Sequence, residues 1–134
     1  VKVLEKFLIE LSYRALPFSD YVEEALQLIN DHHGSISISN VIKKVRVSER
    51  QFSRQFSKIV GISPKHYSKI VQLHYIINLM NQKKYTSLQD IAHSAEFYDL
   101  SHFIHMFKEL TGFSPIEFIK SDKHIALKYF NDLI

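Results

Sequence analysis

Apolar residues recur at helical spacing along most of the chain. Between residues 19 and 31 such a stripe is made by Val22, Ala25, Leu26 and Ile29. The same spacing predicts further helices over residues 1–16, 37–45, 48–60, 64–83, 87–95 and 99–110, and one after Pro115. With three glycines and three prolines in 134 residues, little chain is left for loops. The pattern therefore predicts an all-α fold.

Cap and stop residues delimit the helix predicted at residues 48–60. Ser48 followed by Gln51 predicts a capping box at its start, and Gly61 can adopt the left-handed conformation that ends it. Ser63 and Pro64 then predict the cap and the first turn of the next helix. We expect the apolar stripe of that longer helix to consist of Tyr67, Ile70, Val71, His74 and Ile77.

The helix at residues 48–60 has two different faces. At about 100° per residue, one side carries Phe52, Phe56, Ile59 and Val60. The opposite side carries Arg50, Arg54, Ser57 and Lys58, with Gln51 and Ser53 at its margins. A short helix with an aromatic back and a basic, polar front suits insertion into a DNA major groove. A merely solvated helix face has the same composition, so this helix alone leaves both interpretations open.

This stretch occurs twice in the chain. Displacement by 51 residues aligns Phe52 with Phe103 and Phe56 with Phe107. It also aligns Gly61 with Gly112, Ser63 with Ser114, Pro64 with Pro115 and Tyr67 with Phe118. Upstream, Val41-Ile42 aligns with Ile91-Ala92 at a displacement of 50, so the second turn is one residue longer. The repeat indicates two copies of one helical unit.

These residues resemble the DNA-binding domain of AraC/XylS-type transcription regulators over about residues 21–120. The matching residues are Ser48, Phe52, Arg54, Phe56 and Gly61-Ile62-Ser63-Pro64 in the first copy, and Ile91-Ala92, Phe97, Asp99, Ser101, Phe103, Phe107-Lys108, Gly112 and Ser114-Pro115 in the second. The resemblance implies two helix-turn-helix units joined by a long connecting helix. It also implies a bacterial, cytoplasmic, sequence-specific regulator of transcription, an activator or a repressor, whose partner is double-stranded DNA.

The resemblance divides the chain into three parts. Residues 1–18 form an N-terminal helix or linker, residues 19–120 the DNA-binding domain, and residues 121–134 a helical tail. Within the domain we expect a first unit at about 19–62, a connecting helix at about 63–84 and a second unit at about 85–120. The resemblance implies a homodimer through the N-terminal region and RNA polymerase as a further partner. Alternatively, the N-terminal helix simply packs on the domain.

Three residues depart from the pattern of the family. Glu96 stands where the family usually has a turn glycine, and His105 and Gln72 each stand where it usually has an arginine. The first departure predicts strain in the second turn. The other two weaken the expected DNA contacts of the second unit and of the connecting helix.

Positive charge is concentrated in the first copy. Residues 35–70 hold eight Lys/Arg and one Glu, a net charge of +7, whereas residues 1–34 carry −3 and residues 71–134 carry −1. A basic region of this kind is the electrostatic footprint expected for nucleic acid. On the second recognition helix the front loses most of this charge, because Ser101, His105 and Glu109 replace Arg50, Arg54 and Lys58.

These observations give a set of candidate contacts. We expect DNA contacts from Arg50, Gln51, Ser53, Arg54, Ser57 and Lys58 in the first unit and from Ser101, His105 and Lys108 in the second. Phosphate contacts are expected from Lys43, Lys44, Lys65 and Lys69. The weak front of the second unit keeps a different function open, namely a helical protein-interaction module with the same fold and weak or no DNA binding.

Other kinds of function find little support. The chain has no cysteine, which excludes disulfides and thiolate metal sites, and no apolar run approaches the length of a transmembrane helix. His102 and His105 lie three residues apart, and only Asp99 and Glu109 are near enough in the sequence to add a third metal ligand. Histidines on a DNA-facing helix are more often ordinary polar contacts, so we expect no metal site. A nucleophile elbow and a glycine-rich phosphate loop are both missing, so we expect no catalytic residues, no cofactor and no enzyme.

Overall fold

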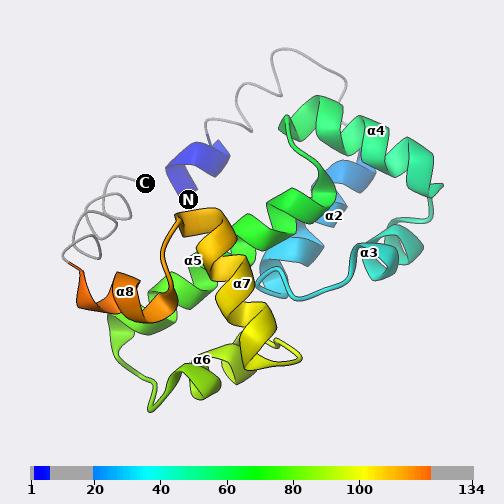
Figure 1. The fold of residues 1–134 in the computed structure, drawn as a ribbon. Helices are drawn as coiled ribbons and strands as arrows, with labels where there is room; N and C mark the ends of the chain where they lie inside the picture. The colour runs from blue at the N-terminus through cyan, green and yellow to red at the C-terminus, as the bar shows by residue number, and fades with distance from the viewer. Residues whose placement is uncertain (1, 7–19, 122–134) are drawn as a thin grey trace. The chain divides into compact units, whose positions relative to one another are not determined.

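The computed structural model describes residues 2–6 and 20–121, and every regular element in these ranges is a helix (Figure 1). After a short helical segment at residues 2–6, the elements are α2 (Asp20–Asp31), α3 (Ile38–Val45), α4 (Glu49–Val60), α5 (Pro64–Gln82), α6 (Leu88–Ser94), α7 (Leu100–Thr111) and α8 (Pro115–Lys120). The predicted all-α fold is confirmed. Predictions for the N-terminal helix beyond residue 6 and for the tail after residue 121 lie outside the described residues.

The described residues form two compact units, one ending at Ser68 and the other beginning at Lys69. In the first unit α2 packs against α3 and α4. Its core consists of buried side chains from these helices, namely Val22, Ala25, Ile29, Val41, Val45, Phe52 and Phe56. Phe52 and Phe56 are fully buried, and their ring centroids lie 5.5 Å apart. The predicted aromatic back of the helix at residues 48–60 is therefore the face that α4 turns inward.

The second unit has a core of the same kind. α6 packs against α7, and α7 against α8. Phe103 and Phe107 are fully buried and stack edge to face at 6.0 Å, and Phe107 meets Phe118 in the same way at 5.2 Å. The core is completed by Ile76, Ile77, Met80, Ile91, Ala92, Ala95 and Met106. The repeat seen in the sequence is thus a repeated core, built around one pair of phenylalanines in each unit.

Helix caps fix where these elements begin and end. Ser37, Ser48, Ser87, Asp99 and Ser114 each accept a backbone N–H from the third residue of the helix that follows. Gly61 and Gly112 close α4 and α7 at φ angles of 88° and 79°. A left-handed residue of this kind is the usual end of a helix.

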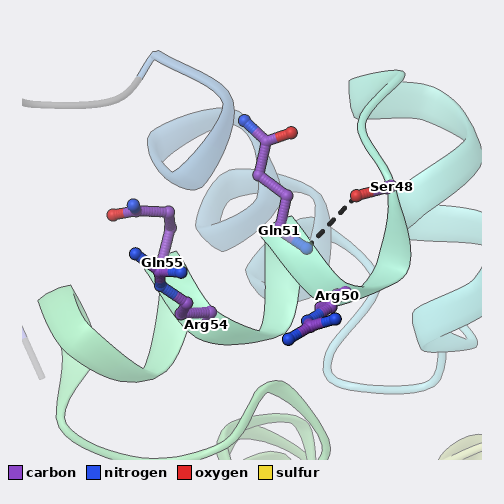
Figure 2. Close-up of a pocket in the computed structure, with 5 residues that line it drawn as sticks. All are labelled: Ser48, Arg50, Gln51, Arg54 and Gln55. Atoms are coloured by element: carbon purple, nitrogen blue, oxygen red, sulfur yellow. Dashed lines mark hydrogen bonds between the residues drawn. The ribbon is translucent and has the colours of Figure 1, made fainter.

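Two local expectations need correction. At Ser48 only half of the capping box forms, because the Gln51 side chain points away from Ser48 (Figure 2). The complete box lies at Ser114, where the Glu117 carboxylate also accepts the Ser114 backbone N–H at 2.8 Å. The stripe predicted for α5 is wrong at Ile70, which is 42% exposed, whereas Ile76 and Met80 are buried. Apolar residues occur all around α5, so the sequence periodicity did not single out the buried side.

Within the described residues, none of the helices combines the length and the apolar character that crossing a membrane requires.

The buried phenylalanines give a test of the core. We expect Phe107→Ala to lower the free energy of unfolding by about 3–5 kcal/mol, because the ring is fully buried and its removal leaves a cavity. Denaturant unfolding followed by circular dichroism would measure the change. Tyr98→Ala is the matched control, since Tyr98 is 97% exposed and its removal should change stability by about 0.5 kcal/mol or less. Equal stability of the two variants would contradict the assignment of Phe107 to the core.

Candidate nucleic-acid interface

The buried side of α4 determines which of its residues point outward. Because Phe52 and Phe56 anchor the helix from inside, the residues on the other side are directed outward. Arg50, Arg54 and Lys58 are exposed along this side, with Gln51 exposed and Ser53 and Ser57 half-buried beside them. Among the residues that the structure describes, neither Arg50 nor Arg54 forms an ion pair. Both guanidinium groups therefore keep their hydrogen-bond donors available for a ligand.

A shallow hollow of about 280 Å³ lies beside these arginines at the start of α4 (Figure 2). It is lined by Ser48, Arg50, Gln51, Arg54 and Gln55. Gln55 was not among the expected contact residues. Its position one helical turn after Gln51 is the signal that could have identified it, because residues four apart share a helix face. Two amides and two guanidinium groups around one hollow can donate hydrogen bonds to acceptor atoms such as base edges or phosphate oxygens.

Three of the four expected phosphate lysines lie on the surface of the first unit. Lys43 and Lys44 are exposed in the last turn of α3, and Lys65 is exposed in the first turn of α5. All three belong to the region of residues 35–70 that carries the net charge of +7. Cations at this density attract a polyanion at long range, although they carry no sequence information.

The start of α5 is fastened to the first unit through Tyr67. Its ring meets Phe56 edge to face at 5.7 Å, and the Asn30 amide donates a hydrogen bond to its hydroxyl at 3.1 Å. Burial raises the pKa of the Tyr67 phenol above its ordinary value near 10. The neutral phenol thus connects the end of α2 with the chain that follows α4, and helps to keep α4 in place.

In the second unit α7 presents a face of the same shape but different chemistry. The Asp99 carboxylate accepts the His102 backbone N–H at 2.7 Å and fixes the start of the helix. With Phe103, Met106 and Phe107 buried, the exposed side carries Ser101, His105, Lys108 and Glu109. The structure thus leaves all three residues expected to contact DNA from this unit on the surface of α7.

Lys69 has a different environment from the other expected phosphate lysines. Its ammonium lies 3.0 Å and 3.2 Å from the two carboxylate oxygens of Glu109, so that it joins α5 to α7 within the second unit. The sequence could not pair these side chains, which are 40 residues apart. The carboxylate of Glu109, which replaces the cation of Lys58 on this helix, is thus held against a cation.

Both turns of the helix-turn-helix units contain a non-glycine residue in the left-handed region. Arg46 has a φ of 58° and Glu96 a φ of 59°. After α6 the backbone N–H of Phe97 bonds the Ala92 carbonyl at 2.9 Å, which is the pattern of a Schellman motif around Glu96. The expected strain at Glu96 therefore has a structural basis, since a side chain in this region costs about 1–2 kcal/mol.

At the second turn, sequence reasoning missed the supporting role of Gln72 and did not consider Tyr98. The Gln72 side-chain amide donates to the Ala95 carbonyl at 3.0 Å, so this residue of α5 supports the turn. Tyr98 lies directly before the cap of α7 and is 97% exposed. The extra residue in the second turn was a sequence signal that could have drawn attention to Tyr98. No sequence signal indicated the hydrogen bond of Gln72, because its partner lies 23 residues away.

His102 and His105, the histidines considered as metal ligands, both lie on α7. His102 packs edge to face on Phe97, with 5.4 Å between the ring centroids. Over residues 2–6 and 20–121 no three His, Asp or Glu side chains are close enough together to hold a metal ion.

Comparison with known proteins identifies the family of this chain. Residues 41–121 match the model of a helix-turn-helix domain, which covers both recognition helices. The chain belongs to the AraC-type helix-turn-helix family. It is also similar to the HTH-type transcriptional regulator YidL of Escherichia coli K12, with 28% identity over 103 residues. That match covers 73% of this chain and 34% of YidL, so the chain spans about a third of the relative.

Solved structures of AraC-type proteins have the same fold. A probable AraC-family transcriptional regulator from Rhodopseudomonas palustris CGA009 superposes with a TM-score of 0.63 at 25% identity, over 76% of this chain and 96% of that one. The C-terminal domain of AraT, a response regulator from Geobacillus stearothermophilus, gives 0.71 at 22% identity, over 78% and 88%. The xylose-binding transcription activator XylR gives 0.61 at 22%, over 80% and 28%. The family is that of DNA-binding transcription regulators.

The left-handed residue in the second turn gives a prediction. Glu96→Gly should raise the free energy of unfolding by about 0.5–1 kcal/mol, because glycine relieves the left-handed strain but loses more backbone entropy on folding. The control is Gly112→Ala at a φ of 79°, where an added Cβ would meet nothing within 4 Å, so that only the backbone cost of about 1 kcal/mol applies. Thermal unfolding of both variants would compare them. A stabilised Gly112→Ala or a destabilised Glu96→Gly would contradict the account of these turns.

Proposed function

We propose that this chain is the DNA-binding part of an AraC-type transcription regulator and recognises a specific double-stranded sequence. The observation that carries the proposal is the outer face of α4. Arg50 and Arg54 are exposed one turn apart and form no ion pair with any residue that the structure describes, and the opposite face of their helix is fixed by fully buried phenylalanines. A rigid helix that presents guanidinium groups outward suits a major groove, where base edges accept hydrogen bonds.

Within this proposal the first unit supplies most of the sequence recognition. Arg50 and Arg54 each present a fork of donors that fits the O6 and N7 atoms of guanine, and Gln51 and Ser53 bond neighbouring base edges or phosphates. Ser57 and Lys58 continue the same face toward the C-terminus of α4. Lys43, Lys44 and Lys65 bind phosphate oxygens, which sets the affinity and the position of the helix on the duplex.

The second unit adds a weaker set of contacts from α7. Ser101, His105 and Lys108 face the next major groove, about 34 Å along the duplex. With one lysine in place of the cations on α4, this helix neutralises fewer phosphates than the first unit does. The +7 charge of residues 35–70 accordingly carries most of the salt dependence of binding.

One observation favours a second candidate function. The exposed face of α7 carries one lysine and one glutamate, a charge balance that also suits contact with another protein. The second candidate is therefore a helical protein-interaction module with little affinity for DNA. The two functions differ in their response to salt, because counterion release makes the affinity for duplex DNA fall steeply as salt rises.

The deciding experiment selects bound sequences from a random pool of DNA duplexes with the full chain. The proposed function expects enrichment of one motif, and binding to that motif that weakens steeply between 50 and 200 mM salt. Failure to enrich any motif, together with no salt-dependent retention of duplex DNA, would overturn it in favour of the interaction module.

Arg54 gives a sharper test on the selected motif. Arg54→Ala should weaken binding by about 1–3 kcal/mol, since it removes one forked contact, and should leave the unfolding transition unchanged because the side chain is exposed. Arg54→Lys is the matched control, because it keeps the charge but not the fork. We expect the lysine variant to keep the salt dependence and to lose base discrimination, both measured by fluorescence anisotropy. Unchanged affinity of Arg54→Ala would remove this residue from the interface.

The difference between the two units gives a further expectation. Base changes under α4 should cost more affinity than base changes under α7, and His105→Arg should strengthen binding by adding a permanent cation and a fork to the weaker helix. A mutational scan of the selected motif, made with the wild-type chain and with His105→Arg, would measure both effects. Equal sensitivity of the two half-sites and no gain from His105→Arg would show that the charge difference between the helices does not matter for binding.

A further inference from the structure

The ion pair between Lys69 and Glu109 has no equivalent in the sequence repeat. Displacement by 51 residues aligns Glu109 with Lys58, which is exposed in the last turn of α4. The first unit therefore has a cation at the place where the second has a carboxylate. In the second unit that carboxylate holds the ammonium of Lys69 at 3.0 Å and 3.2 Å through its two oxygens.

This pair does little to stabilise the fold. The side chains of Lys69 and Glu109 are 29% and 49% exposed, respectively. Ion pairs that water can reach contribute little to stability, because solvent screens the attraction and both side chains lose freedom. For the same reason the pair can exchange partners easily when another anion approaches.

The pair lies where such an anion would arrive. Glu109 belongs to the exposed side of α7, directly after Lys108 and one turn after His105. In the function proposed above this side faces the groove, so that DNA phosphates come close to the Lys69–Glu109 pair. A phosphate oxygen is a hydrogen-bond acceptor for ammonium as good as a carboxylate.

We propose that Glu109 determines specificity by withholding Lys69 from DNA until α7 is seated in the correct groove. On DNA of arbitrary sequence Lys69 stays paired with Glu109 and adds nothing to the electrostatic affinity. On the correct sequence, base contacts hold α7 close to the duplex, and a phosphate replaces Glu109 as the partner of Lys69. This inference rests on the proposed function, and it makes Lys69 a phosphate contact of the specific complex alone.

The proposal predicts opposite effects for the two partners. Each phosphate contact contributes about 0.9 to the slope of log affinity against log salt. Glu109→Gln should steepen that slope by about 0.9 on a scrambled duplex and leave it unchanged on the selected motif. Lys69→Gln should reduce the slope by about 0.9 on the selected motif and leave the scrambled duplex unchanged. A change of 0.9 corresponds to about 3.5-fold in the affinity ratio between 50 and 200 mM salt.

Two controls separate this mechanism from a general effect of charge. Glu24→Gln makes the same change in net charge at an exposed position of α2, in the other unit, and should alter neither slope. The double variant Lys69→Gln/Glu109→Gln should lose the steeper slope on scrambled duplex, because that slope depends on Lys69. Thermal unfolding of each variant would show that the fold is intact.

The outcomes are distinct. A steeper slope on scrambled duplex that persists in the double variant would mean that Glu109 repels phosphate directly, and would overturn the inference. The inference would also be overturned if Glu109→Gln changed the salt slope equally on both duplexes, or did not change it on either. Both of these results would leave the proposed function intact. A wild-type chain that selects no motif would overturn the inference, and one that also shows no salt-dependent retention of duplex DNA would overturn the proposed function as well.

Discussion

The pairs of buried phenylalanines are the interaction on which the rest of the structure depends. Phe52 with Phe56, and Phe103 with Phe107, each lie one turn apart on a recognition helix and are fully buried. A buried ring contributes a large apolar area and fixes the rotation of its helix about its own axis. Once α4 and α7 are fixed in this way, their exposed residues can only face solvent or a ligand.

Capping residues fix the two ends of each recognition helix. Ser48 and Asp99 cap the starts, and Gly61 and Gly112 close the ends in the left-handed conformation. Before α7, the chain tolerates strain at Glu96, and the hydrogen bond from Gln72 supports the preceding carbonyl. These caps and turns fix which residues are the first and last of each helix, and therefore which side chains its exposed face presents.

The same backbone plan carries very different charge in its two copies. Within the described part of the chain the arginines on the outer face of α4 form no ion pair, whereas α7 carries a glutamate that is bound to Lys69. The two copies thus have similar cores and different surfaces. Core positions are constrained by close packing on all sides, while exposed positions tolerate substitution with little effect on stability.

The sequence by itself determined the helices, their caps, the buried aromatic residues and the family, because each depends on residues close together in the chain. Periodicity also placed Arg50 and Arg54 on the outer face of α4. The tertiary structure alone decided the features that join distant residues. It paired Lys69 with Glu109 and Gln72 with Ala95, and it showed which side of α5 is buried. Such contacts depend on how helices pack, and the local pattern of a sequence does not record that.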